Sequence, residues 1–263
     1  MEKQRIVVKV GSSTLTGDNG ALKLRTIDKL AQVLSALRNE GNHVILVSSG
    51  AIAVGMNKMR LPMKPTEISM KQAVAAVGQC ELIHIYDKCF GEYGNIVGQI
   101  LLTADDIAVK QKRRNLTNTF EALLENGMIP VVNENDSISH AEIKTDKQVF
   151  GENDMLSAIV ARLTEANRLI ILSDIDGLYD SNPDINPDAT LLHRVEEITD
   201  EIRGLAAGAG TDRGTGGMVT KLDAAEYATM HGIDMHITNG SDPENIYRIL
   251  EGEECGTHFV RRG

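Results

Sequence analysis

Short apolar runs alternate with longer amphipathic segments along nearly the whole chain, and this alternation restricts the fold strongly. Runs of strand length lie at 5–10, 44–48, 96–102, 128–132, 168–173 and 235–238. Segments with helical periodicity lie at 26–39, 66–93, 116–124, 154–163, 218–230 and 243–250, and the second is long enough for two helices. Strands that alternate with helices are typical of βα units in a parallel sheet. We therefore predict an α/β fold with a central, mainly parallel sheet.

The length of 263 residues allows a large core, and α/β folds of this size often form one unit. Aromatic residues make up only 3% of the chain, and Trp is absent. The core must therefore consist mainly of Val, Ile, Leu, Met and Ala, which suits a parallel sheet buried on both faces. We expect a single domain.

The formal net charge of −10 disfavours nucleic acid and anionic membranes as partners, because both are densely negative. A basic run at Lys110, Lys112, Arg113 and Arg114 could contact RNA or phosphate, but such a run is more often a solvated helix face.

The three cysteines have no C-x-x-C spacing, which argues against a disulfide framework and a zinc site. No apolar stretch approaches the roughly 20 residues of a membrane span, so we expect a cytoplasmic protein.

The loop after the first predicted strand joins a lysine to a glycine turn. Lys9 lies near the end of the strand, and Gly11 and Ser12 turn the chain. An ammonium group and free backbone N–H groups at this place could converge on a phosphate. A lysine near a strand end is, on its own, more often solvated, so this loop alone does not identify a phosphate site.

Two further loops combine glycine with polar residues at the start of a helix. In Ser48-Ser49-Gly50-Ala51, the glycine lets the backbone approach a ligand and the helix N-terminus attracts anions, although an ordinary N-cap serine explains the pattern as well. In the segment 215–221, two glycines precede a helix and Lys221 lies one turn inside it. That combination favours phosphate, the alternative being a glycine loop without a ligand.

The usual nucleotide and hydrolase motifs are missing from the sequence. There is neither a G-x-x-x-x-G-K-[ST] motif nor a G-x-G-x-x-G motif after a strand, and the seven histidines are scattered. The remaining lysines, carboxylates and amides fit phosphoryl transfer to a carboxylate, whose ordinary pKa of about 4.3 leaves it ionised without a general base. Such a reaction needs charge neutralisation, which Lys9 and Lys221 can supply together with Mg²⁺ on the nucleotide.

The segment between residues 137 and 152 departs from the alternation of strands and helices. Mixed polar residues surround β-prone islands at 142–144 and 148–150. This composition predicts a hairpin that projects from the sheet and is placed to act as a substrate lid.

Six motifs, in order along nearly the whole chain, resemble the amino acid kinase family. They are Val-Lys-Val-Gly-Ser-Ser at 8–13, Ser-Ser-Gly-Ala-Ile at 48–52, Val-Asn-Glu-Asn-Asp at 132–136, Phe-Gly-Glu-Asn-Asp at 150–154, Ser-Asp-Ile-Asp-Gly-Leu-Tyr at 173–179 and Gly-Thr-Gly-Gly-Met-Val-Thr-Lys at 214–221. The third and the sixth resemble most the members that phosphorylate the side chain of glutamate. The resemblance implies an αβα sandwich, with glutamate held by roughly 1–165 and ATP by roughly 166–263.

The resemblance also implies roles for individual residues. Catalytic roles fall to Lys9, Lys221 and Asp154, which would hold the two lysines in place. Substrate binding falls to Ser49, Gly50, Ala51, Asp136 and Asn153. Nucleotide binding falls to Lys9, Gly11, Ser12, Ser173, Asp174, Tyr179, Thr215, Gly216, Gly217, Met218, Val219, Thr220 and Lys221. An ionised Asp136 suits the substrate ammonium, whereas by itself it is explained equally well as a loop carboxylate that caps backbone N–H groups. No metal ligand is assigned, because Mg²⁺ is expected to be carried by the nucleotide.

The implied reaction is the ATP-dependent formation of L-glutamyl 5-phosphate and ADP, the first step of proline biosynthesis. The resemblance further implies proline as a feedback inhibitor, a glutamate-5-semialdehyde dehydrogenase that receives the labile product, and a homo-oligomer. Many members carry a PUA domain after the kinase part, and we expect its function to be absent here. The alternatives are a relative acting on N-acetylglutamate, aspartate, carbamate or UMP, and a non-catalytic nucleotide or proline sensor. The presence of Lys9, Asp154 and Lys221 speaks against a sensor.

Overall fold

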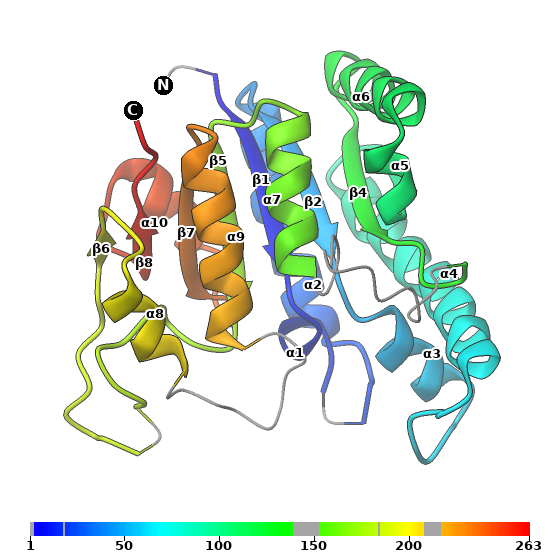
Figure 1. Cartoon of the computed structure of the whole chain (residues 1–263). Coiled ribbons are helices and arrows are strands. Elements are labelled where there is room, and N and C mark those ends of the chain that lie inside the picture. The colour runs from blue at the N-terminus through cyan, green and yellow to red at the C-terminus, as the bar shows by residue number, and fades with distance from the viewer. Residues whose placement is uncertain (1–2, 18, 139–152, 184, 208–216) are drawn as a thin grey trace.

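An eight-stranded sheet lies between two layers of helices in the computed structural model, which describes residues 3–17, 19–138, 153–183, 185–207 and 217–263 (Figure 1). The strands are β1 Arg5–Val10, β2 His43–Ser48, β3 Val97–Leu102, β4 Ile129–Glu134, β5 Arg168–Ser173, β6 Arg194–Val195, β7 Asp234–Asn239 and β8 Thr257–Phe259. The helices are α1 Ser12–Leu15, α2 Leu24–Asn39, α3 Ala51–Lys58, α4 Ile68–Glu92, α5 Ala104–Ala108, α6 Lys110–Glu125, α7 Asn153–Leu163, α8 Asp200–Ala207, α9 Met218–Met230 and α10 Asn245–Glu251. The expected αβα sandwich is confirmed.

The sheet is mainly parallel, as predicted, with the strand order β3-β4-β2-β1-β5-β7-β8-β6. Its central strand β1 pairs in parallel with β2 on one side and with β5 on the other. Only the short β8 runs antiparallel to its neighbour β7 among the described strand pairs, and β6 follows the direction of β8. Because β6 and β8 have two and three residues, no periodicity in the sequence could identify them.

The central strands are buried on both faces, which is why they read as continuous apolar runs rather than alternating ones. In β1, Val7 belongs to the core shared with α7 and α9, whereas Ile6 and Val8 belong to the core shared with α2, α4 and α10. Figure 1 shows α7 and α9 side by side on the near face of the sheet. As expected from the scarcity of aromatic residues, both cores consist mainly of Val, Ile, Leu and Ala.

Helices α3 and α4 touch through their backbones at two glycines. A Cβ atom added to Gly78 would lie 1.7 Å from the carbonyl oxygen of Ala51, and one added to Gly55 would lie 2.0 Å from that of Val74. No larger residue fits these positions without moving a helix, since real Cβ atoms do not approach so closely. The long helix α4 therefore fixes the position of the first turn of α3.

Several predicted boundaries need correction. The segment 66–93 forms the single helix α4, and the helix predicted at 116–124 begins already at Lys110. The basic run therefore occupies the exposed first turns of α6, where Lys112 pairs with Asp106. Helices α5 and α8 were not predicted, and β4 continues to Glu134, two residues beyond its apolar run. The hairpin predicted within 137–152 falls almost entirely outside the described residues. No described helix combines the length and the apolar character needed to cross a membrane.

Candidate active site

The candidate site lies at the edge of the sheet where the parallel strands end. Because β2 and β5 flank β1 on opposite sides, the loops after these three strands start from the same edge. Such an edge forms the ligand crevice of open parallel sheets. Figure 1 shows this edge at the bottom, where β1 leads into α1 and where α7 and α9 begin.

Three charged residues from distant parts of the chain meet there. The Lys9 Nζ atom, near the end of β1, lies 2.6 Å from Asp154 Oδ1 in the first turn of α7. The Lys221 Nζ atom, one turn into α9, lies 3.3 Å from Asp154 Oδ2. The carboxylate of Asp154 thus bridges two ammonium groups, and nothing in the spacing of these residues along the chain indicates the contacts.

The environment of this cluster explains its charge state. Asp154 is 1% exposed, and both Lys9 and Lys221 are 7% exposed. Burial alone would raise the pKa of Asp154, but the ammonium groups of Lys9 and Lys221 outweigh it and hold this pKa below its ordinary value. The Thr220 hydroxyl donates a further hydrogen bond to Asp154 Oδ2 at 3.2 Å. Asp154 is therefore an ionised, fixed anchor for both lysines.

Asn153 connects the start of α7 to the loop after β2. Its Nδ2 atom donates one hydrogen to Ser49 Oγ at 2.7 Å and shares the other between the Ser48 carbonyl oxygen at 3.1 Å and Asn133 Oδ1 at 3.2 Å. Since Ser49 Oγ accepts this hydrogen bond, its own hydrogen can point to a ligand. The predicted substrate residues Ser49 and Asn153 are thus in direct contact.

Gly50 requires glycine for a conformational reason. It adopts φ +96° and ψ 4°, which places it in the left-handed region immediately before α3. A Cβ atom at this position would lie 3.8 Å from Ser12, so the loops after β1 and β2 are neighbours. Ala51 follows as the first residue of α3, where the first backbone N–H groups have no acceptor within the helix and can bind an anion. Gly11 in the first loop has an ordinary φ of −78°.

Asp136 follows β4 and is half-buried. Desolvation and the neighbouring Glu134 carboxylate raise the pKa of Asp136 to about 6, while Lys64 acts against them. A cation bound beside Asp136 would stabilise the ionised carboxylate and lower its pKa again. The charge of Asp136 therefore suits an ammonium group.

The predicted nucleotide residues after β5 form a separate group. Ser173 is buried at the end of β5 and donates to the exposed Asp174 carboxylate at 3.1 Å. Tyr179 donates to Asp176 Oδ2 at 3.2 Å, and Asn239 at the end of β7 donates to Asp176 Oδ1 at 2.8 Å. This surface joins the ends of β5 and β7. Asp176 and Asn239 were not predicted as site residues, although Asp176 lies in the loop after β5 and Asn239 is the last residue of β7.

The glycine-rich segment before α9 is described only in part. Thr215 and Gly216 lie outside the described residues. Gly217 precedes the helix, and its carbonyl oxygen lies 2.9 Å from the Thr220 hydroxyl, so it shares the single Thr220 hydrogen with Asp154 Oδ2. Val219 is exposed, but the Met218 side chain is 6% exposed and belongs to the core. Met218 can therefore contribute to a ligand site only through its backbone.

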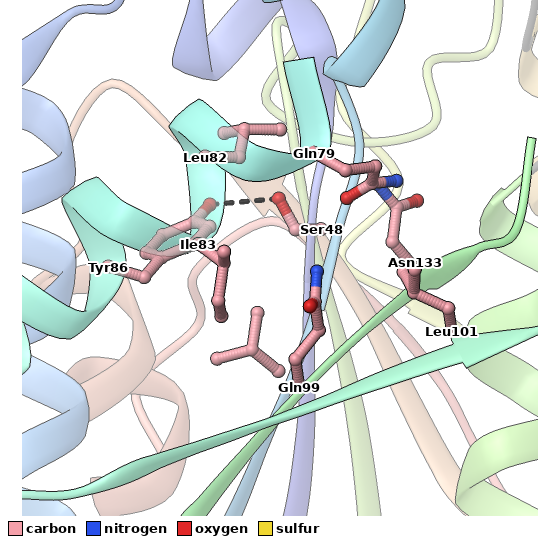
Figure 2. Close-up of a pocket in the computed structure, with 9 residues that line it drawn as sticks. Ser48, Gln79, Leu82, Ile83, Tyr86, Gln99, Leu101 and Asn133 are labelled. Carbon is pink, nitrogen blue, oxygen red and sulfur yellow. Dashed lines mark hydrogen bonds between the residues drawn. The ribbon is translucent and has the colours of Figure 1, made fainter. Parts of the chain in front are cut away.

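Two residues that contact Asn153 or Ser48 were not predicted as site residues. Asn133 ends up beside Asn153, and its own Nδ2 atom is buried without a hydrogen-bond partner. Tyr86 of α4 reaches Ser48, and both line a small cavity with Gln79 and Asn133 (Figure 2). Asn133 could have been found from its place after an apolar strand, whereas Tyr86 resembles any aromatic residue of the core. No three His, Cys, Asp or Glu side chains gather as a metal site within the described ranges.

Comparisons with known proteins agree with this architecture. The sequence profile of the amino acid kinase family matches residues 4–239. A glutamate 5-kinase from Clostridium perfringens is 57% identical over 261 residues, which cover 99% of this chain and 97% of that protein. A glutamate 5-kinase from Listeria innocua is 54% identical over 259 residues, covering 98% of this chain and 94% of that protein.

Solved structures of low sequence identity share the fold. Carbamate kinase from Giardia lamblia, bound to AMP-PNP, has a TM-score of 0.70 at 14% identity and covers 99% of both chains. UMP kinase from Ureaplasma parvum has a TM-score of 0.67 at 17% identity, covering 99% of this chain and 100% of that chain. These likenesses extend over the full sheet and both layers of helices.

Proposed function

Because the chain belongs to the amino acid kinase family, we propose that it transfers the γ-phosphoryl group of ATP to the side-chain carboxylate of L-glutamate. The products are L-glutamyl 5-phosphate and ADP, and the acyl phosphate is the first intermediate of proline biosynthesis. The observation that carries this choice of acceptor is the 57% identity to a glutamate 5-kinase over 99% of the chain.

The reaction requires the protein to align the substrates and neutralise charge, but not to remove a proton. A glutamate carboxylate oxygen attacks the γ-phosphorus, the bond from this phosphorus to the β,γ-bridging oxygen breaks, and ADP leaves with the electron pair. The attacking carboxylate has an ordinary pKa of about 4.3, so it is ionised near neutrality and needs no general base. The protein has to align two anions that repel each other and to neutralise the charge on the moving group.

Lys9 and Lys221 supply that positive charge in this proposal. The Asp154 contacts of 2.6 Å and 3.3 Å support it, because one ionised carboxylate keeps both ammonium groups at the same place before any ligand binds. Preorganised charge of this kind stabilises a transition state without reorganisation during the reaction. Asp154 is a positioning residue here, and the lysines are the groups that meet the phosphoryl oxygens.

The acceptor binds between the loops after β2 and β4. The Ser49 hydroxyl, oriented by Asn153, and the backbone N–H groups that follow Gly50 donate to the glutamate, and Asp136 accepts from its ammonium group. Asp136 also separates glutamate from N-acetylglutamate, since an acetylated nitrogen carries no positive charge to offset the half-buried carboxylate.

The nucleotide binds on the other side of β1, along Ser173, Asp174, Tyr179 and the segment 215–221. Glutamate then lies in the half formed by residues 1–165 and ATP in the half formed by residues 166–263. Mg²⁺ is expected to arrive with the nucleotide, and we assign no protein ligand to it. It would offset phosphate charge alongside Lys9 and Lys221.

A direct assay tests the proposal. The protein is incubated with ATP, Mg²⁺ and L-glutamate, and the acyl phosphate is trapped with hydroxylamine as a coloured hydroxamate. We expect hydroxamate formation that is lost in the Lys221→Ala variant. The same assay with N-acetylglutamate, aspartate, carbamate and UMP separates the related activities. Binding of ATP and glutamate in calorimetry without ADP release would instead support a non-catalytic sensor.

Three partners follow from this function. Proline, as the end product of the pathway, acts as a feedback inhibitor. A glutamate-5-semialdehyde dehydrogenase receives the acyl phosphate, which hydrolyses readily in water. The active protein assembles as a homo-oligomer. Proline inhibition is tested in the hydroxamate assay, and the assembly by light scattering.

A further inference from the structure

We propose that Tyr86 is a positioning residue for the glutamate-binding loop, which acts through Ser48 to hold the Ser49 hydroxyl toward the acceptor. The inference rests on the proposed function, in which Ser49 contacts glutamate. It assigns to α4, which contributes no residue to the predicted site, a part in acceptor binding.

The contact between Tyr86 and Ser48 is buried and close. Tyr86 is 1% exposed and Ser48 is 2% exposed. Their oxygen atoms, Tyr86 Oη and Ser48 Oγ, lie 2.9 Å apart, as the dashed line in Figure 2 shows. Burial raises the pKa of Tyr86 well above its ordinary value, so the phenol keeps its hydrogen at any physiological pH.

The direction of the hydrogen bonds follows from the number of hydrogens available. Ser48 Oγ donates its single hydrogen to the Ser49 carbonyl oxygen at 3.2 Å. Tyr86 Oη must therefore be the donor in the contact with Ser48 Oγ. The result is a chain of hydrogen bonds from α4 through Ser48 to the backbone of Ser49.

The loop is then held from two sides. On one side Asn153 of α7 binds Ser49 Oγ and the Ser48 carbonyl oxygen. On the other side Tyr86 of α4 fixes the Ser48 side chain and, through it, the Ser49 carbonyl group. With its backbone held and one lone pair of Oγ occupied by Asn153, Ser49 keeps the hydrogen of its hydroxyl for the acceptor.

The small cavity beside Ser48 makes the hydrogen bond necessary. It is lined by Ser48 and Tyr86 together with Gln79, Leu82, Gln99 and Asn133 (Figure 2). Because Ser48 borders this cavity, packing does not enclose its side chain on every side. The hydrogen bond from Tyr86 therefore helps to hold Ser48 in the orientation that supports Ser49.

The test compares variants that remove single hydroxyl groups. Tyr86→Phe keeps the ring in the core and removes only Oη. We expect the KM for glutamate to rise about five- to tenfold, the usual effect of one hydrogen bond, with the KM for ATP and kcat changed less than about twofold. Ser48→Ala should give a similar rise, and the double variant should be no worse than the stronger single one, because both act through one chain.

The matched control is Tyr93→Phe at the end of the same helix. The Tyr93 hydroxyl donates to Asp28 at 3.1 Å on the surface, so its loss should leave the KM for glutamate unchanged. Thermal unfolding of each variant is measured in parallel. If Tyr86→Phe does not fold at the assay temperature, Ser48→Ala at the surface of the cavity carries the same test.

Three results would overturn the inference. They are an unchanged KM for glutamate in Tyr86→Phe, an equal rise in the KM for both substrates, and additive effects of the Tyr86 and Ser48 substitutions. A wild-type protein that forms no hydroxamate would instead refute the proposed function, and the inference with it. The wild-type assay therefore distinguishes the two failures.

Discussion

The carboxylate of Asp154 lies 2.6 Å from the ammonium group of Lys9, and this contact joins the first turn of α7 to the central strand β1. Both residues are almost completely buried. Two charges are costly to bury, even as a pair, and such a pair is often no more stable than apolar residues of the same size. We infer that this contact serves the chemistry of the site more than the stability of the fold.

Lys9→Ala should lower kcat by about 10²–10³, which corresponds to about 3–4 kcal/mol of transition-state stabilisation. The KM for ATP should rise much less, because the lysine meets charge that develops during transfer. Steady-state ADP release at saturating glutamate measures both constants. Lys29→Ala is the control, since Lys29 pairs with Glu244 on the surface and should leave both constants unchanged. An unchanged kcat in Lys9→Ala would refute the role.

Asp154→Asn should destabilise the protein by about 3–5 kcal/mol, because it leaves the ammonium groups of Lys9 and Lys221 buried without their shared carboxylate. Urea unfolding at pH 7.5 measures the loss. The pKa of Asp154 is lowered in the folded protein, so its stabilisation is present above the ordinary pKa and disappears only as the pH falls through the lower folded value. The difference between wild type and variant should therefore shrink in acid below about pH 4. Adding Lys9→Met to the variant should restore part of the stability.

The sequence predicted the central strands most accurately. The expected bounds of β1 and β5, 5–10 and 168–173, are those of the structure, because both strands are buried on two faces and have an uninterrupted apolar stretch, at 6–8 and 169–172. For β4 the prediction stopped at Val132. Asn133 and Glu134 are polar, and their place in the sheet comes from pairing with Leu101 and Leu102 of β3, which no local pattern indicates.

The sequence identified many of the residues of the site, but not the contacts between them. Glycines and lysines after strands identified Lys9 and Lys221 as candidates, and only the family resemblance linked them to Asp154. Tyr86 could not be found, because a buried aromatic on an apolar helix face indicates a core residue, and its hydroxyl contact with Ser48 depends on how α4 packs on β2. Asp136 was expected from the resemblance, but its raised pKa depends on burial and on Glu134.

The affinity for glutamate should depend on pH through Asp136. Its pKa is raised to about 6 by desolvation and by Glu134, and only the ionised form can bind the substrate ammonium group. We expect kcat/KM for glutamate to fall as the pH drops below about 6, approaching tenfold per pH unit, because this ratio reports the free enzyme. The kcat/KM for ATP over the same range is the control. A profile for glutamate that stays flat down to pH 5 would contradict the role of Asp136.

Asp136→Asn should make the protein more stable but weaken its binding of glutamate. A carboxyl group whose pKa is raised in the folded state does not change the free energy of unfolding below its unfolded pKa near 3.8. Above that value it lowers the free energy of unfolding, and this destabilisation is complete once the pH exceeds about 6. The amide avoids that cost, so the variant should be more stable than wild type at pH 7.5 by about 1–3 kcal/mol and equally stable near pH 3.5. The KM for glutamate should rise at least tenfold. Urea unfolding at the two pH values, with glutamate kinetics at pH 7.5, tests both parts.

Gly78→Ala in α4 should displace the start of α3 and with it the glutamate-binding loop. The added Cβ would lie 1.7 Å from the Ala51 carbonyl oxygen, a backbone atom that can move only with the first turn of α3. We expect a loss of about 3 kcal/mol in the free energy of unfolding and a higher KM for glutamate, with the KM for ATP little changed. Gly91→Ala in the same helix is the matched control, since nothing lies within 4 Å of its Cβ position and alanine favours the helix by about 0.5–1 kcal/mol. Opposite signs of the two stability changes would show that the contact between the helices, and not helix propensity, decides the effect, whereas two stabilising substitutions would contradict the close packing of α3 on α4.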